Sequence, residues 1–174
     1  MCMSFFSRLL GPRRDPREEL RPLWHRVVEI SREPHWYARA GVADSVAGRF
    51  DMISVVLALV LLRMENDPDL APRSALLTEL FVEDMDGQLR ETGVGDLMVG
   101  KHIGKLMSVL GGRLGALRKG LADDHETPLA AALERNITLG ERADPQALAQ
   151  DVRTLARMLA HTPSPDILEG RIGP

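Results

Sequence analysis

The sequence contains few aromatic residues and a single cysteine, Cys2. Aromatic side chains make up 4% of its 174 residues. One cysteine can form neither an intramolecular disulfide nor a zinc site that needs several thiolates. Runs that alternate β-branched and polar residues are also missing, whereas leucine and alanine dominate. This composition excludes a disulfide scaffold and favours helices over sheets.

The sequence also lacks a membrane-length hydrophobic segment and a strong net charge. Its longest apolar run, 52–62, would form a helix about 16 Å long, whereas a bilayer core is about 30 Å thick. The formal net charge of −3 gives no global basic field of the kind that attracts nucleic acid. We therefore expect the run to be a buried central helix of a cytoplasmic globular protein, with no specific nucleic-acid partner.

Apolar residues recur at steps of three and four along most of the chain, which predicts amphipathic helices. The predicted fold is all-α, with a single compact domain of about six to seven helices over residues 16–162. Residues 1–15 are expected to be a flexible tail, either frayed or amphipathic and in contact with anionic lipid or a partner. Residues 163–174 are expected to be a second flexible tail with at most one docked turn. The helices are predicted to begin at Pro16, near Arg49, near Arg73, at Asp96, at Pro128 and at Pro145, with a short helical element over 35–41 that ends at Gly41.

The segment GDLMVGKH, residues 95–102, resembles a phosphate-binding P-loop except that His102 replaces the final Ser or Thr. A P-loop joins a strand to a helix, so that backbone N–H groups surround the phosphates. Here the preceding segment, 76–89, has a helical period, and the hydroxyl that would hold magnesium is missing. The segment therefore does not predict a nucleotide site.

The glycines of this region are better explained by helix packing. Gly93 and Gly95 bracket a predicted turn between two helices. Gly100 and Gly104 lie four residues apart in the second helix, where each interior glycine costs about 1 kcal/mol relative to alanine. Either a neighbouring helix packs unusually close to these glycines, or they leave a groove for the helix of a partner.

No catalytic residue, metal site or cofactor is predicted. Glu83, Asp84 and Asp86 resemble the start of a calcium loop, but the further oxygen ligands and the final Glu of that loop are missing. They form either a solvated helix face or a charged face for a partner. The histidines are dispersed, and no two of them have the spacing of a helical metal site: they are His25, His35, His102, His125 and His161.

Several segments together resemble the ubiquinol–cytochrome c chaperone family. The most specific is LFVEDMDGQLRETGVGDLMVGKHIGKL, residues 80–106, with its acidic EDMD, its GVGDL and its GK followed by basic helix positions. DSVAGRFDMISVVLALVLLRM, residues 44–64, resembles the family's GRFEM segment, and LADDHETPLAAALERNI resembles a later one. The similarity extends from about Leu20 to Leu139. Trp24 occupies a position where the family often has tyrosine, and Gly111-Gly112-Arg113 replaces a segment that is more aromatic in the family.

The resemblance implies an assembly factor rather than an enzyme. Members of the family bind cytochrome b during biogenesis of the ubiquinol–cytochrome c reductase (bc1) complex, and mitochondrial members act with a small partner protein at the ribosome. No mitochondrial targeting region precedes the domain, so a bacterial member is expected. It would work in the cytoplasm, with peripheral contact at the cytoplasmic face of the inner membrane.

On this interpretation charged residues at the rim of a glycine-lined groove contact the apolar segment of cytochrome b. The predicted partner-binding residues are Glu83, Asp84, Asp86, Arg90, Lys101, Lys105, Arg49 and Asp51, with Gly93, Gly95, Gly100 and Gly104 as turn or groove glycines. The competing hypothesis is a ribosome- or RNA-associated adaptor. Its basic helix face would consist of Lys101, Lys105, Arg113, Arg118 and Lys119.

Overall fold

The computed structural model describes residues 15–91 and 96–173. The elements are a 3-10 segment η2 (Pro16–Leu20), α1 (Arg21–Ser31), α2 (Pro34–Ala38), α3 (Val46–Glu65), a 3-10 turn η3 (Ala71–Arg73), α4 (Ser74–Glu91), α5 (Asp96–Ala122), α6 (Glu126–Asn136), α7 (Pro145–His161) and α8 (Ser164–Leu168). Within the two described ranges no residue belongs to a strand, and Val42 and Leu139 form an isolated antiparallel bridge. The predicted all-α fold is confirmed.

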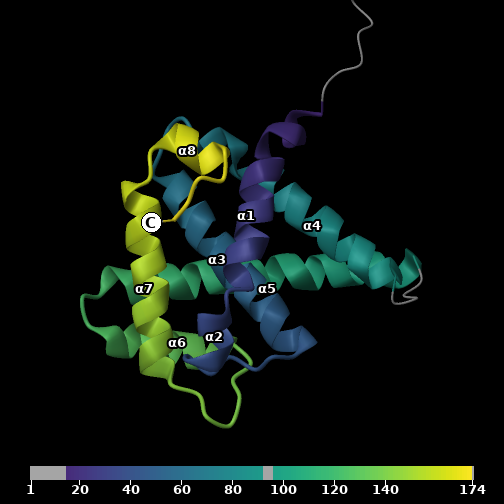
Figure 1. The fold of residues 1–174 in the computed structure, drawn as a ribbon. Helices are drawn as coiled ribbons and strands as arrows, with labels where there is room; N and C mark the ends of the chain where they lie inside the picture. The colour runs from purple at the N-terminus through teal and green to yellow at the C-terminus, as the bar shows by residue number, and fades with distance from the viewer. Residues whose placement is uncertain (1–14, 92–95, 174) are drawn as a thin grey trace, which may run out of the picture.

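Helix α3 occupies the centre of the molecule, as the apolar run predicts. Residues 51–61 are all buried, and α1, α4, α5 and α7 pack around them (Figure 1). The helix begins at Val46, three residues before the predicted start at Arg49. Ser45 is the reason, because its hydroxyl accepts a hydrogen bond from the Gly48 backbone N–H at 3.2 Å and so caps the first turn.

Two other helix boundaries differ from those predicted, and proline explains both. The helix expected to run unbroken from Pro16 divides into η2 and α1, because Pro22 has no N–H to donate to the Glu18 carbonyl four residues earlier. Helix α6 begins at Glu126 rather than at Pro128. Pro128 lies in the first turn, where its missing N–H has no helical acceptor to lose.

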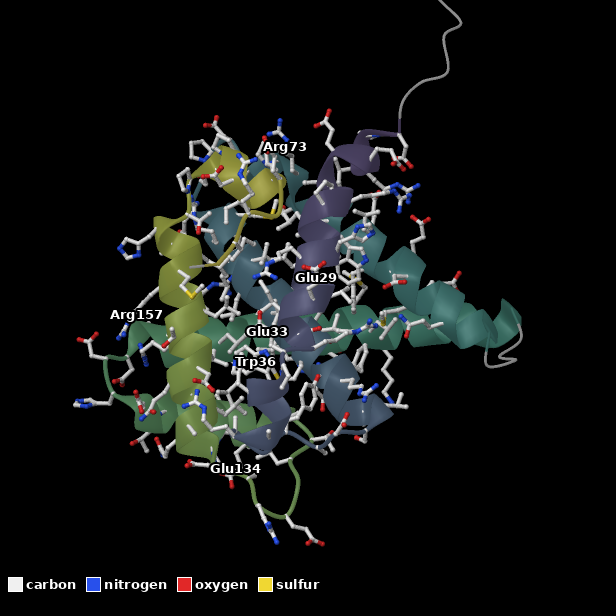
Figure 2. The ribbon with its side chains drawn as sticks, viewed as in Figure 1. Glu29, Glu33, Trp36, Arg73, Glu134 and Arg157 are labelled. Carbon is white, nitrogen blue, oxygen red and sulfur yellow. The ribbon has the colours of Figure 1, made fainter. Side chains whose placement is uncertain are left out.

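The short helix α2 is held by its tryptophan. Trp36 is buried between α2 and the rest of the body, and its indole Nε1–H donates to the Ile30 carbonyl at 2.7 Å (Figure 2). Gly41 follows with a φ of 76°, as its predicted role at a helix end requires. A Cβ there would lie 2.4 Å from the Cα of Ala143, so only glycine allows the chain after α2 to lie against 142–143.

The C-terminal segment is docked further along its length than the sequence predicts. The expected docked turn is α8, whose Ile167 is buried. Ile172, four residues after α8 ends, is also buried, and its carbonyl accepts from Arg26 Nε of α1 at 2.9 Å. Residues 163–173 thus complete the packing around α1 instead of forming a tail.

The longest helix, α5, crosses the molecule behind α1 and α3 (Figure 1). Its C-terminal half packs against α6, where Leu117 and Gly120 are buried. Its N-terminal end projects together with the end of α4, at the right of Figure 1. None of the helices described is long and apolar enough to cross a membrane.

Candidate partner-binding surface

An apolar groove opens on the surface where the start of α3 meets the projecting parts of α4 and α5. Its volume is about 730 Å³. We call it the apolar groove and define it by the side chains that line it: Arg32, Val46, Ala47, Arg49, Phe50, Ile53, Met85, Gln88, Lys105, Leu106 and Val109. Val46 is 90% exposed at its edge. Large exposed apolar side chains next to a concave surface are typical of binding sites.

Of the described residues that line the apolar groove, all the charged ones are cations. Arg49 forms an ion pair with Asp44 at 2.7 Å, and both side chains are largely exposed. Arg32 and Lys105 are exposed and form no ion pair within the part of the chain that the structure describes. The groove therefore combines an apolar floor with a basic rim.

A buried ion pair lies next to Phe50, one of the side chains that line the apolar groove. Asp51 of α3 is 7% exposed and pairs with Arg113 of α5, which is 6% exposed. The guanidinium carbon of Arg113 lies 5.7 Å from the centre of the Phe50 ring, which lines the groove. Arg113 also donates to the Asn136 carbonyl at 2.8 Å. Helices α3, α5 and α6 are thus joined beside Phe50.

This arrangement corrects two predictions. Asp51 was expected on the partner face, but its Oδ2 accepts from both the backbone N–H and the hydroxyl of Thr138 at 2.7 Å, and its Oδ1 accepts from Arg113. Arg113 was expected on a basic helix face for RNA, and it is buried instead. An isolated buried charge is unfavourable, so each group requires the other. Both are internal structural residues.

The predicted acidic residues lie beside a second hollow, between α1 and α4. It has a volume of about 510 Å³ and we call it the acidic hollow; it is lined by Arg21, Trp24, His25, Val28, Glu29, Leu80, Glu83, Asp84, Gly87 and Gln88. Glu83 is exposed and accepts from Arg17 Nη1 at 2.9 Å. Gln88 lines both this hollow and the apolar groove. The two surfaces are therefore neighbours on α4.

Arg17 is fixed by a second carboxylate before it reaches Glu83. Its Nε donates to both oxygens of Asp15 at 3.0 Å. Hydrogen bonds from the side chain and backbone of Arg17 lower the pKa of Asp15 to about 2. Since Arg17 is held in place by Asp15, the segment before α1 is tied to α4 at the edge of the acidic hollow.

The remaining predicted residues divide into two groups. Lys105 lines the apolar groove, Asp86 is half-buried on α4, and Arg49 stands at the groove rim. The other predicted contacts lie outside the residues whose surroundings the structure describes: Arg90, Lys101, Gly93, Gly95 and Gly100. The structure therefore brings Arg49 and Lys105 together, and places Glu83 and Asp84 on the adjoining hollow.

No glycine among the described residues lines the groove, which corrects the expectation for Gly104. This residue is exposed beside Lys105, and a Cβ added to it would meet nothing within 4 Å. A Cβ added to Gly111, Gly112 or Gly115 would likewise meet nothing within 4 Å. Close packing by another described helix of this chain, which was one of the two explanations for the glycines of this region, is therefore wrong for these four positions. Gly120 is the exception, because a Cβ there would lie 3.0 Å from the Cα of Leu129.

Little remains of the basic helix face on which the adaptor hypothesis rests. Arg113 is buried, and Arg118 pairs with Glu65 at 2.7 Å. Lys105 and Lys119 are exposed, and they lie on the same helix 14 positions apart, or about 21 Å along its axis. These cations do not form one continuous patch.

Sequence reasoning did not identify the apolar side chains of the groove or Arg153 of α7. Arg153 is buried and donates to the carbonyls of Asp123 at 2.8 Å and His125 at 3.2 Å, and it also reaches those of Gly120 and Leu121. These hydrogen bonds satisfy backbone carbonyls at the end of α5, which have no donor within the helix. Its position among the core-facing residues of α7 is the signal that could have revealed it.

The described residues contain no group of three or more His, Cys, Asp or Glu side chains placed to hold a metal ion. What the surface offers is an apolar groove with a basic rim, next to an acidic hollow. Such a surface is suited to binding an apolar segment with charged neighbours, because apolar contact supplies affinity and charge supplies orientation.

A family model described as "Ubiquinol-cytochrome C chaperone" matches residues 38–173. The chain belongs to this family. The match confirms the resemblance seen in the sequence, and it includes every residue that lines the apolar groove except Arg32. The family is one of chaperones.

A solved structure supports the same conclusion. The crystal structure of the Cbp3 homolog from Brucella abortus is similar over 90% of this chain and 88% of that chain, with 31% sequence identity and a TM-score of 0.77. None of the curated proteins matches the chain. The chain described here, a member of the ubiquinol–cytochrome C chaperone family, therefore shares the fold of the Cbp3 homolog over most of both chains.

Proposed function

We propose that this chain is a non-enzymatic assembly chaperone for ubiquinol–cytochrome c reductase, and that it binds cytochrome b through the apolar groove. The apolar groove carries the proposal, since family membership alone does not indicate where a client binds. The protein acts in the cytoplasm and touches the inner membrane peripherally. A small assembly partner or the ribosome can bind in addition, through surfaces outside the groove.

The physical reason for such a chaperone lies in the client. Cytochrome b is synthesised as apolar helices joined by short charged connections. Before insertion, an apolar helix exposed to water associates with other apolar surfaces. The groove offers it Phe50, Ile53, Met85, Leu106 and Val109 as a temporary apolar environment. Because the groove is open to solvent, the helix can leave when membrane becomes available.

The acidic hollow suits the connections between those helices. Connections on the cytoplasmic side of a membrane protein are enriched in lysine and arginine. Glu83 and Asp84 supply negative charge close to Gln88, where the acidic hollow adjoins the groove. A client helix in the groove can therefore place its basic connection on the acidic hollow without a change in either surface.

Substitution of Val46 by glutamate tests the groove. The side chain is 90% exposed and lies in the first turn of α3, where an acidic residue interacts favourably with the helix dipole. Folding should therefore be unchanged, whereas an apolar client should lose contact with the groove edge. The measurement is recovery of cytochrome b, identified by immunoblot, with the tagged chaperone, together with the amount of assembled bc1 complex on a native gel.

Gln146→Glu is the matched control, because it also adds one negative charge in the first turn of an exposed helix, on α7 and away from the groove. Cytochrome b should be recovered with this variant as with the wild type. Equal recovery with Val46→Glu would show that the groove is not the client site.

Reversal of charge at Asp84 tests the acidic hollow separately. Asp84→Lys should weaken recovery of cytochrome b while the helical circular dichroism signal remains unchanged. Recovery of ribosomes by the wild-type chain, without cytochrome b, would instead favour the adaptor hypothesis and contradict the proposed client.

A further inference from the structure

The basic rim of the apolar groove has a consequence for the kind of segment that it accepts. We infer that the groove selects an apolar helix with acidic residues beside its apolar face, and that Arg32 and Lys105 make this selection. The inference rests on the proposed function, because it specifies the chemistry of the client segment at the same site.

Among the described residues, the charges that line the groove have one sign. Arg32, Arg49 and Lys105 come from the end of α1, from α3 and from α5, and no acidic side chain described in the structure lines the groove with them. Asp44 partly neutralises Arg49. Among the residues described, Arg32 and Lys105 have no such partner and remain available to an incoming carboxylate.

The shape of the groove favours a polypeptide segment over a bilayer surface. The groove is a concave surface whose walls come from three helices, and its volume is about 730 Å³. A lipid surface contacts protruding side chains, whereas a helix inserts its apolar face between walls. Phe50, Ile53 and Met85 line the groove and are at least partly buried, so a client must enter the groove to reach them.

The selection follows from contact between charges at the rim of an apolar site. A glutamate beside the apolar face of the client lies within reach of Lys105 or Arg32 and forms a new ion pair. A lysine at the same position meets a like charge and is disfavoured. Each ion pair at an exposed site changes affinity by about fivefold at most, so two pairs separate the acidic and basic clients by up to about 25-fold.

The neighbouring acidic hollow gives the bound client a direction. Gln88 joins the two surfaces, with the cations on the groove side and Glu83 and Asp84 on the other. A segment whose acidic residues flank its apolar face and whose basic residues follow in the connection fits both surfaces at once. The reverse order places like charges together at both.

Three synthetic peptides test the inference. They share one amphipathic helical sequence and carry glutamate, glutamine or lysine at the two positions that flank the apolar face. Fluorescence anisotropy with the full-length chain measures their affinities at low and at physiological salt. We expect the glutamate peptide to bind best and the lysine peptide worst, with a difference that shrinks as salt increases.

Variants of the chain identify the responsible cations. Lys105→Glu should reduce affinity for the glutamate peptide by about fivefold to tenfold and improve binding of the lysine peptide. Arg32→Gln should reduce the preference by a smaller factor. Lys119→Glu is the matched control, because it makes the same change on the same helix outside the groove, and it should leave the preference unchanged. Thermal unfolding of each variant verifies that the fold is retained.

Each outcome supports or overturns the inference. Equal binding of the glutamate and lysine peptides, lost in Val46→Glu, would overturn the charge selection and leave the client groove in place. Failure of all three peptides to bind would overturn both proposals. Binding to vesicles of equal parts phosphatidylcholine and phosphatidylglycerol that depends on Lys105, without peptide binding, would assign the rim to an anionic membrane.

Discussion

The two halves of α5 have opposite environments, although they belong to one helix. The C-terminal half is packed against α6, with Gly120 against Leu129 and Arg153 on its last carbonyls. The other half projects with α4, and glycines at 104, 111 and 112 face open space. One half contributes to the core, and the other presents a surface. The boundary between them is Arg113, where the buried ion pair with Asp51 lies.

This difference shows how the chain separates stability from binding. Residues that hold the fold together are joined across three or more elements, as Asp51, Arg113 and Thr138 are. Residues that line the apolar groove, such as Val46 and Lys105, lie at the edge of that network. Substitutions on the two sides of Arg113 should therefore have different consequences.

The largest effect is expected at the boundary itself. Arg113→Met leaves the buried Asp51 carboxylate without its cation, and removal of one partner of a buried pair typically destabilises a protein by about 3–5 kcal/mol. Urea unfolding followed by circular dichroism measures the loss. The double variant Asp51→Asn/Arg113→Met should lose much less than the sum of the single variants.

The control for this prediction is Arg118→Met, on the same helix. Arg118 forms an exposed pair with Glu65, so less than about 1 kcal/mol should be lost. Similar losses for Arg113→Met and Arg118→Met would contradict the role of the buried pair as the joint between α3 and α5.

The next largest effect on stability is expected when glycine is replaced by alanine in each half of α5. Gly120→Ala places a Cβ 3.0 Å from the Cα of Leu129, so α6 must shift, and we expect a loss of about 1–2 kcal/mol. Gly112→Ala meets nothing within 4 Å and should stabilise the chain by about 0.5–1 kcal/mol. Chemical unfolding of both variants measures the difference.

If Gly112→Ala stabilises the isolated chain, the same variant provides a test of binding. A gain in stability with normal recovery of cytochrome b would show that the open glycine has no role in client contact. Destabilisation by Gly112→Ala would contradict the open environment of this half of α5.

Acid sensitivity is expected at the packed side of the molecule, where α3, α7 and α8 meet. Asp67 accepts hydrogen bonds from Ser164 and Arg63, and these lower its pKa from the ordinary value of 3.8 to about 2. A lowered pKa in the folded state stabilises the fold fully above pH 3.8. This contribution is lost as the pH falls from about 4 towards 2.

Asp67→Asn should therefore reduce the dependence of the urea midpoint on pH between 5 and 2, and Ser164→Ala should reduce it in part. Tryptophan fluorescence measures the midpoint. Asp15 has a pKa of about 2 as well, so the variants are compared in the wild-type and Asp15→Asn backgrounds. An unchanged slope in Asp67→Asn would show that this contact does not contribute to acid stability.

The smallest effect on stability is expected in the groove. Val46→Glu should change the free energy of unfolding by less than about 0.5 kcal/mol, because the side chain is exposed and the change is compatible with the start of a helix. A loss comparable to that of Gly120→Ala would show that the groove edge belongs to the folding core after all.

The sequence predicts the elements of this fold better than the roles of its charged residues. The apolar run at 52–62 specifies the central helix, since only complete burial suits it, and Asp144 with Pro145 specifies the start of α7. The Asp51–Arg113 pair was missed because the two residues lie 62 positions apart and no local pattern connects them. Arg113 does fall among core-facing residues of α5, three positions after Leu110 and four before Leu117, and that position is a usable signal.

The candidate site was predicted in part for the same reason. Charge and helical spacing identified Glu83, Asp84, Arg49 and Lys105 as surface residues. The groove itself depends on how α3, α4 and α5 meet, so the positions of Phe50 and Met85 on one wall could not be read from either segment alone. Concave shape is a property of tertiary packing and has no local sequence signal.

The attachment of the C-terminal residues to α1 affects the order in which the chain folds. Ile172 receives a hydrogen bond from Arg26 across 146 residues, and the Gly170 backbone fits against Pro22. During synthesis from the N-terminus, α1 must therefore wait for residues 163–173 before it is fully packed. A nascent copy cannot reach its final stability until this segment has left the ribosome.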